Sequence, residues 1–529
     1  MTGPAHIFPI RRASPCKPPF LPPVNRLIQF LTGVVLLSRF GFCATAAESA
    51  TDERSLFGLT NLWTLQLTIS AADWEKLGAR GSPQPWNNNG GGGQQGMVEG
   101  IVRGIFGNGG QGRQMTVRPP GRADADGESR YPWVSCTLEG AGQKATNASI
   151  RFKGVSSMVR APNAYKRPFK LDFNRKDKDG RFMGLKGFYL NNNVNDATQM
   201  REALAYDLFH QAGVAAPRTA FARVLLTIPG HLEKRNLGLY TMVEVVEGDF
   251  IKRSFGSKKG LLLKPESMQG LEYMGEDWGA YEGRYHPKGE PNPEEEKRLI
   301  EFVRFIRESA PNQFAAHLQD YVDIEPFSRY IALNALMANV DSFIGNGHNY
   351  FLHISPVSHK ATFIPWDLNE SFGMHPVSGP SEQQLRTSII RPNADPNLLV
   401  ERFVKDPTLG PVYRAQCAWL LTNVFVASKI ATNIERISAV TKPVIFSESK
   451  RARVDFERTV LKTVGQEEGD TSQPRRDLEY NNTGYRPWSF PDGIVIDNLP
   501  LVDWVALRRS NSIDQLEGKV KGTKPRPRF

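Results

Sequence analysis

Residues 330–373 constrain the fold more than any other part of the 529-residue chain, because regular elements and polar side chains follow one another closely there. Asp323 is a suitable N-cap and Pro326 suits a first helical turn, so a helix should begin at this point. Apolar residues at helical spacing follow, and the same face reaches Asp341. We therefore expect a helix that ends at Asp341, with its carboxylate on the buried side.

Two strands should follow that helix. Glycines mark a loop after Asp341, and residues 349–354 and 361–366 are then rich in β-forming side chains. Two short strands meeting around one connection would hold Asp341, Asn346 and Asp367 over one small volume.

The order of these three side chains indicates phosphoryl transfer. That chemistry needs hard oxygen ligands for a metal ion and an acceptor that orients the attacking hydroxyl group. Protein kinases present a base, a metal ligand and a second metal ligand in the chain order of Asp341, Asn346 and Asp367. The alternative is structural, in which the same residues end a helix, serve a turn and fix a loop.

A strand with two lysines and a helix with a glutamate near its start are predicted before residue 330. Residues 165–173 alternate in polarity, so Lys166 and Lys170 share one face of a predicted strand and would reach nucleotide phosphates. The alternative is a solvated sheet face.

Glu202 lies near the start of a predicted helix, where kinases carry the glutamate that pairs with a strand lysine. The alternative is a surface charge favoured near a helix N-terminus.

The chain is similar to the spore-coat protein H (CotH) family of atypical, kinase-like proteins. The resemblance runs from residue 62 to residue 373 and rests on six blocks in the family's order. The blocks are RFKGVSS at 151–157, KRPFKLDF at 166–173, FYLNNNVNDATQMREALAYDL at 188–208, GLYTMVEVVEGDF at 238–250, VDSFIGNGHNYFL at 340–352 and IPWDLNESFG at 364–373.

This resemblance implies an α+β fold, namely an atypical protein-kinase-like fold of two lobes with a C-terminal helical extension. The small lobe would span residues 60–265, and the large lobe with its extension would span residues 266–465. The nucleotide would bind between the lobes, and the implied cofactors are ATP and Mg²⁺. We expect residues 466–529 to form a polar tail.

The resemblance also implies roles for individual residues. Asp341 would be the catalytic residue that orients or deprotonates the acceptor hydroxyl. Asn346 and Asp367 would hold magnesium, with Asn349 as an alternative to Asn346. The residues around the nucleotide would be Lys166, Lys170, Glu202, Glu244 and Lys264. The chain departs from the family pattern at Asn369, where the family commonly carries a second Asp, and the change removes one negative charge beside the metal.

The first 46 residues predict an export signal. Residues 27–37 are apolar but too few to span a bilayer, and Ala44-Thr45-Ala46 supplies the small residues that a signal peptidase favours. Loss of this segment would lower the net charge of +11 by five. An uncleaved membrane anchor is the alternative. No later segment is long and apolar enough to predict a membrane span.

Composition adds few further constraints. Hydrophobic residues make up 40% of the chain, which is enough for a large core, and the low-complexity residues 81–130 predict a flexible insertion. No basic patch interleaved with aromatic residues indicates nucleic-acid binding. Only Cys136 and Cys417 follow the signal, and their pairing is left open. Neither a Cys-x-x-Cys nor a His-Glu-x-x-His motif is present, so we do not expect a zinc site.

Together these features predict an exported CotH-like atypical protein kinase that transfers the γ-phosphoryl group of ATP to protein hydroxyl side chains. The chain would be periplasmic, cell-surface or secreted, and its partner would be an unidentified protein substrate at the cell surface. One alternative is a catalytically inactive kinase-like module with a binding or structural role. Another is a metal-assisted hydrolase that uses the same carboxylates with His348.

Overall fold

A computed structural model of the chain describes residues 56–78, 131–154, 157, 165–266, 270–375, 378–394, 397–462 and 499–525. The chain divides into two compact units, Met1–Ser49 and Ala50–Phe529, and every described residue belongs to the second unit. The predicted signal segment 1–46 and the predicted insertion 81–130 therefore lie outside the described residues.

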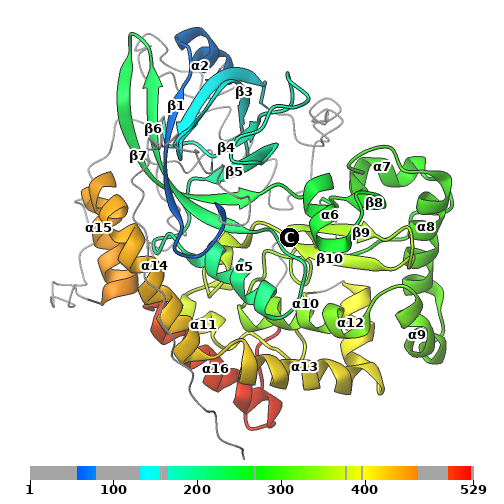
Figure 1. Cartoon of the computed structure of the whole chain (residues 1–529). Helices are drawn as coiled ribbons and strands as arrows, with labels where there is room; N and C mark the ends of the chain where they lie inside the picture. Colours follow the sequence, from blue (N-terminus) through cyan, green and yellow to red (C-terminus); the bar gives the residue numbers. More distant parts are fainter. Residues whose placement is uncertain are drawn as a thin grey trace, which may run out of the picture. The chain divides into compact units, whose positions relative to one another are not determined.

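Seven strands of the second unit close into a barrel (Figure 1). The strands are β1 (Leu62–Thr68), β2 (Val134–Gly140), β3 (Gln143–Phe152), β4 (Phe169–Asp172), β5 (Gly187–Asn191), β6 (Thr219–Ile228) and β7 (Leu232–Glu244), in the spatial order β1-β2-β3-β4-β5-β7-β6. Neighbours pair antiparallel except β1 and β6, whose parallel pairing closes the barrel.

Side chains point alternately to the two faces of each strand, and those on the inner face fill the barrel interior. In β4, Phe169 and Leu171 belong to the barrel core, whereas Lys170 and Asp172 lie on the other face. The two-residue alternation predicted over residues 165–173 is confirmed for residues 169–172, which form β4. β3 repeats the pattern with Ile150 in the same core.

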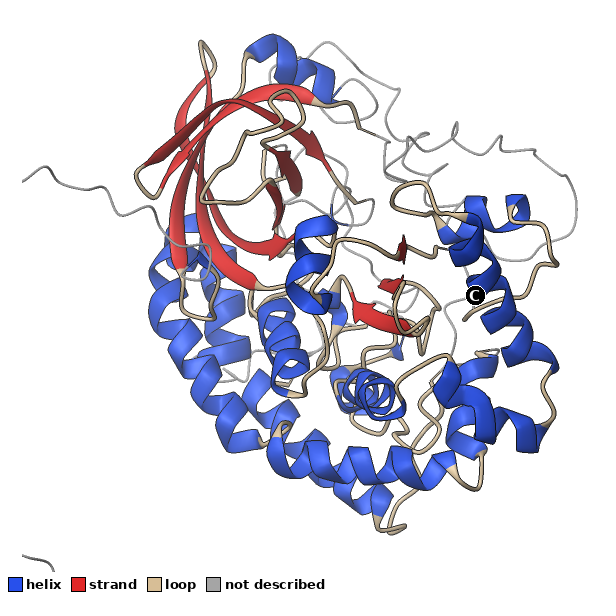
Figure 2. Ribbon diagram, turned by 45° about the vertical axis from the view of Figure 1, so that its right-hand side comes forward, coloured by secondary structure: helices blue, strands red, loops and turns tan. Residues whose placement is uncertain are grey.

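A second, smaller sheet has the strand order β10-β9-β8 and is antiparallel throughout. Its strands are β8 (Leu261–Leu263), β9 (Tyr350–Ile354) and β10 (Ala361–Pro365). The two strands predicted at 349–354 and 361–366 are therefore confirmed to within one residue. Figure 2 shows the barrel strands and these short strands as separate groups, with helices around them.

Helices make up most of the remaining described chain. They are α2 (Ala71–Gly78), α5 (Arg201–Gln211), α6 (Gly248–Phe255), α7 (Gly279–Tyr285), α8 (Pro293–Glu308), α9 (Pro311–His317), η1 (Leu318–Asp320), α10 (Ile324–Leu336), η2 (Leu368–Glu370), α11 (Ser381–Gln384), α12 (Leu398–Lys405), α13 (Leu409–Asn423), α14 (Ala427–Glu448), α15 (Lys450–Phe456), η4 (Glu457–Leu461) and α16 (Leu501–Leu516). The mixture of helices and strands is an α+β fold, as predicted.

Helix α10 ends before the predicted point. Its last residue is Leu336, so the expectation of a helix that reaches Asp341 is wrong. Ala338 adopts a left-handed backbone with φ of 50°, and the next N–H, that of Asn339, donates to the carbonyl of Asn334 (2.8 Å). This bond pattern is the Schellman C-cap, and it usually occurs at glycine. No sequence signal marked this helix end, because alanine instead of glycine occupies the left-handed position.

Helix α16 lies within the predicted polar tail, and the sequence analysis missed it. Leu501, Trp504 and Val505 from one face of this helix are buried in the core that the helices share. The buried Arg508 guanidinium donates to the carbonyl of Leu336 through Nε (3.0 Å), so α16 caps the end of α10.

The two described cysteines are both free and buried. Cys136 belongs to the barrel core and Cys417 to the core formed by the helices, so they do not form a disulfide. Burial raises the pKa of each thiol to about 12, because it disfavours the charged thiolate.

Among the described helices, no single one has the length and apolar character that a membrane span requires. Helices α13 and α14, which meet at a bend of 53°, meet those criteria only when taken together. Ile434, Ile437 and Ile445 of α14 are buried in the helical core.

Candidate active site

The paired strands β9 and β10 position the predicted catalytic stretch. Tyr350 lies opposite Pro365, and one step further the Trp366 N–H donates to the carbonyl of Asn349 (3.1 Å). Asn349 and Asp367 both adopt left-handed backbone, with φ of 57° and 53°. They therefore lie at the same end of the strand pair. Non-glycine residues in this conformation are uncommon, and strained backbone clusters at functional sites.

Asp341 is held at this end by three polar side chains. Asn346 Nδ2 donates to Oδ1 (2.7 Å), and Asn349 Nδ2 donates to Oδ2 (3.0 Å) and to the main-chain carbonyl (2.9 Å). His348 Nε2 lies 2.7 Å from Oδ1. Only 8% of Asp341 is exposed, so these contacts fix the orientation of its carboxylate. The structure thus brings together Asp341 and Asn346, two of the three residues expected over one small volume, and adds Asn349, which was the alternative to Asn346.

Asp367 lies next to helix α5. It occupies the N-cap position of η2, and its N–H donates to the Tyr206 hydroxyl of α5 (3.2 Å). Its carboxylate raises the pKa of Glu202 on the same helix, which is a sign that the two carboxylates are close. Asp367 and Glu202 therefore belong to one acidic pair.

Glu202 connects that pair to the barrel. Asn191 Nδ2 donates to both Glu202 carboxylate oxygens (2.9 and 2.8 Å), and Lys153 Nζ donates to Asn191 Oδ1 (2.6 Å). Burial first, and then the Asp367 carboxylate, raise the pKa of Glu202 to about 7.

Lys153 is a site residue that the sequence analysis did not single out. It follows β3 directly, and its ammonium group lies 4.7 Å from the ring centre of Tyr189 and 5.5 Å from that of Trp366. These two rings pack edge to face at 5.0 Å. Because Trp366 immediately precedes Asp367, the contacts bring Lys153 to the same region. Its place in the RFKGVSS block was the signal that could have identified it.

Lys166, one of the two lysines expected to contact phosphates, instead forms an ion pair with Glu448 at the end of α14. It precedes β4 rather than lying on it, so the predicted strand position is wrong. The Arg167 N–H donates to the Tyr165 carbonyl (2.8 Å) in a tight turn, and Pro168 has no N–H for a sheet ladder. Burial lowers the pKa of Lys166, while Glu448 opposes that shift.

Lys170, the other lysine expected to contact phosphates, lies on β4. Its Nζ is 3.1 Å from Glu247 Oε1 and 5.3 Å from the ring centre of Tyr189, which Lys153 also contacts. Lys170 therefore lies on the same face of the barrel as Lys153.

Glu244 and Lys264 each have a nearby partner. The Glu244 carboxylate pairs with Arg218 and Arg253, at 2.7 Å in both cases. Lys264 Nζ lies 3.0 Å from Glu266. None of these three ion pairs includes a described residue that contacts Asp341 or Asp367.

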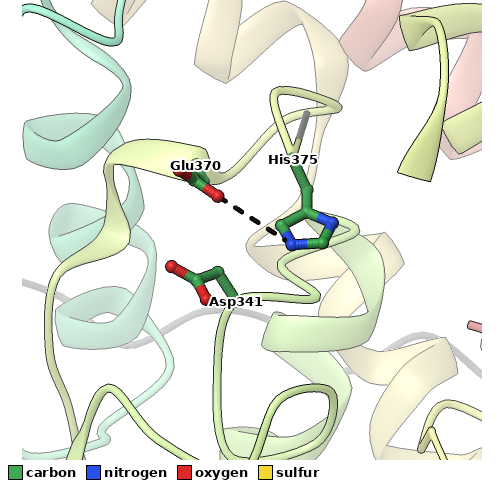
Figure 3. A group of neighbouring side chains, drawn as sticks. All are labelled: Asp341, Glu370 and His375. Atoms are coloured by element: carbon green, nitrogen blue, oxygen red, sulfur yellow. Dashed lines mark ion pairs between the residues drawn. The ribbon is translucent and has the colours of Figure 1, made fainter. Parts of the chain in front are cut away.

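Two more residues join Asp341. Potential ligand atoms of Asp341, Glu370 and His375 all lie within 4.8 Å of one another, and all three residues are buried. Figure 3 shows these side chains reaching toward one another from separate backbone segments. Glu370 directly follows Asn369, so a carboxylate stands one residue beyond the departure from the family pattern. Sequence reasoning missed Glu370 and His375, because their spacing follows no recognised ligand motif.

The described chain is an α+β fold that carries a buried Asp–Asn cluster at Asp341 and a Lys–Asn–Glu network at Glu202. The family profile described as "CotH kinase protein" matches residues 150–462, more than half of the chain. The chain therefore belongs to the CotH kinase family. Inner spore coat protein H of Bacillus subtilis (strain 168) is 24% identical over 221 residues, a match that spans 40% of this chain and 58% of that relative.

Proposed function

We propose that this chain is an atypical protein kinase that transfers the γ-phosphoryl group of ATP to a protein hydroxyl group. The observation that carries the proposal is the buried Asp341 carboxylate, held by Asn346, His348 and Asn349 at the strand end that also bears Asp367. Kinase chemistry requires an oriented carboxylate beside an acidic metal-binding position.

Asp341 receives the acceptor's proton in this proposal. The acceptor oxygen forms a bond to the γ-phosphorus, the bond from that phosphorus to the β–γ bridging oxygen breaks, and its electron pair leaves on ADP. The hydroxyl proton passes to an Asp341 carboxylate oxygen. The amide N–H groups of Asn346 and Asn349 hold that carboxylate in place, so little reorganisation is needed at the moment of transfer.

The donor groups fit magnesium, which prefers oxygen ligands. Asp367 would hold it with Glu202, since two close carboxylates, one of them fully buried, are stabilised by a dication. Asn346 and Asn349 use their amide N–H groups on Asp341, so any metal contact from them would come from the amide oxygens. Bound magnesium would neutralise charge on the nucleotide phosphates.

The barrel would supply the phosphate contacts. Lys153 and Lys170 lie around one aromatic ring, that of Tyr189, and Lys153 joins Glu202 through Asn191. This arrangement supports the lysine–glutamate pairing of kinases, with Lys153 in the role that we first gave to Lys166. We propose the two-lobed kinase-like arrangement on this basis, with the barrel in the small lobe.

We also propose that the chain is exported and acts on a protein at the cell surface. The apolar residues 27–37 and Ala44-Thr45-Ala46 support export, and the name of the related spore coat protein is consistent with a surface location. N-terminal sequencing of secreted protein should find a start near Ala47. An intact Met1 on that material would contradict cleavage of a signal segment.

Nucleotide-dependent stabilisation tests the nucleotide site. With Mg²⁺ and ATP at a hundred times its dissociation constant, the wild-type free energy of unfolding should rise by about 2.7 kcal/mol. Asp367→Asn should abolish that rise and leave the nucleotide-free unfolding midpoint almost unchanged, because the amide has the same shape. The matched control is Asp323→Asn, an exposed carboxylate paired with Lys360, which should behave as wild type.

Two outcomes would count against the kinase proposal. An undiminished rise in Asp367→Asn would show that Asp367 is not a metal ligand. The complete absence of stabilisation in the wild-type protein would favour the inactive binding or structural module.

A further inference from the structure

The group formed by Asp341, Glu370 and His375 differs from the magnesium site proposed at Asp367. Its three residues are 8%, 5% and 0% exposed, respectively. They come from the loop after α10, from η2 and from the segment after Gly373. Asp367 is not a member of this group among the described residues.

The contacts of His375 fix the direction in which its Nε2 points. Its Nε2 is 3.5 Å from the Asn346 amide nitrogen and 4.0 Å from Glu370 Oε2, and its Nδ1 is 2.7 Å from Ser378 Oγ. Nε2 lies on the side of the carboxylates (Figure 3). With the proton on Nδ1, where Ser378 Oγ would accept it, Nε2 would present its lone pair to a metal ion at this position.

The backbone of His375 is also fixed. The buried Gln384 side chain donates from Nε2 to the His375 carbonyl (3.0 Å) and accepts the His375 N–H at Oε1 (3.3 Å). Ser378 orients the ring from its far side, as outer hydrogen-bond partners orient metal-binding histidines. The imidazole is therefore held in place before any ion binds.

We propose that Asp341, Glu370 and His375 bind a first-row transition-metal dication, such as Mn²⁺ or Zn²⁺. Two carboxylates and one imidazole form a mixed oxygen and nitrogen donor set, and imidazole favours transition metals over Mg²⁺. A dication would also compensate the two negative charges that are buried close together. The sequence search for zinc motifs overlooked this site because its ligands at 341, 370 and 375 lie far apart in the chain.

A metal ion in this site would affect phosphoryl transfer, an inference that rests on the proposed function. An Asp341 oxygen bound to a transition metal would no longer accept the acceptor's proton. Occupancy by this ion would therefore lower phosphoryl transfer, whereas binding of the ion itself requires no transfer activity.

Manganese binding to metal-free full-length protein tests the site. Electron paramagnetic resonance titration should detect bound Mn²⁺, with coupling to the nitrogen of one imidazole. Glu370→Gln and His375→Gln should each weaken Mn²⁺ binding by at least about tenfold. The matched control is His353→Gln, which removes a buried histidine whose Nε2 faces the Lys259 carbonyl, and it should leave Mn²⁺ affinity unchanged.

The proposal would be overturned if both ligand variants bound Mn²⁺ as the wild type does, or if an equal concentration of Mg²⁺ displaced the ion. Nitrogen coupling is measured on wild-type protein, so its absence would refute the site even if a variant failed to fold. The Asp367→Asn stabilisation assay is independent of this result and separates a failure here from a failure of the kinase proposal.

Discussion

Lys153 and Lys166 have different partners, and these partners assign them different roles. Lys153 reaches Asn191 and the rings beside Asp367, whereas Lys166 is buried against Glu448. A lysine that contacts phosphates needs access to the nucleotide, while a lysine buried in an ion pair stabilises the fold. We therefore propose Lys153 for the phosphate contact.

Lys153→Met should weaken ATP binding by about tenfold to a hundredfold, because one charge-assisted hydrogen bond contributes roughly 1.5–3 kcal/mol. Isothermal titration calorimetry in the presence of Mg²⁺ measures this change. Lys360→Met is the matched control, since Lys360 pairs with Asp323, and it should bind ATP normally. Equal ATP affinity in Lys153→Met and wild type would refute the assignment.

Glu202 should make stability depend on pH. Its pKa is raised from 4.5 to about 7 in the folded protein, so between these values the folded state binds more protons than the unfolded state. Stability should therefore fall as pH rises from 4.5 to 7, by about 3 kcal/mol at 1.36 kcal/mol per pKa unit.

Glu202→Gln should remove this pH dependence in metal-free buffer, because the amide does not titrate. Unfolding midpoints of both proteins at the two ends of the window measure the effect. If the wild type and the variant lose the same stability between these pH values, Glu202 is not the group responsible.

Sequence reasoning predicted part of the site at the level of single residues. Asp341 and Asn346 lie together as expected, and Asn349 joins them, because all three lie within one short loop and strand start. Lys166 was assigned to a strand that in fact begins after Pro168, and alternation alone does not reveal where a strand begins. His375 joins the cluster through a loop whose path no sequence periodicity describes.

Helix α14 is connected to the barrel by a buried charge. The Glu448 carboxylate pairs with Lys166 and accepts the Leu239 N–H of β7 (3.2 Å). Its side chain is 12% exposed and that of Lys166 is 4% exposed. Removal of one member of such a pair leaves a buried charge without compensation.

Glu448→Gln should therefore destabilise the protein by about 3–5 kcal/mol, which thermal unfolding at neutral pH measures. The double variant Lys166→Met with Glu448→Met should recover most of this loss, because neither charge remains buried. An unchanged unfolding midpoint in Glu448→Gln would mean that the ion pair contributes nothing to the docking of α14.

The elements were predicted with uneven success. Asp323 takes the expected N-cap position of α10, but the end of that helix depends on a left-handed alanine and on Arg508 from a distant helix. Helix α16 carries apolar residues at positions 501, 504 and 505, which is helical spacing. The polar composition of the surrounding tail concealed this pattern.

At the level of the whole molecule, the order of the six sequence blocks predicted the family, and the α+β class followed from it. Closure of the barrel could not be predicted, because the parallel pairing of β1 with β6 joins Leu62 to Phe221. Strand pairing across such a separation in the chain leaves no local sequence signal.

Helix α5 links the barrel to the site. Its Glu202 contacts Asn191 of the barrel, and its Tyr206 contacts Asp367.

The central claim is that Asp341 accepts the proton of the acceptor hydroxyl. Asp341→Asn removes this capacity and should lower turnover with Mg²⁺ and labelled ATP by at least about a hundredfold. ATP affinity should change little. Because both carboxylate oxygens accept amide N–H groups, the variant should also lose about 1–2 kcal/mol of stability.

Turnover and the unfolding midpoint should therefore be measured on one preparation of Asp341→Asn, with a surface extract of the host as acceptor and at a temperature where the variant is fully folded. We expect labelled protein from the wild type and at least about a hundredfold less from the folded variant. Near-normal labelling by a folded Asp341→Asn protein would contradict the account.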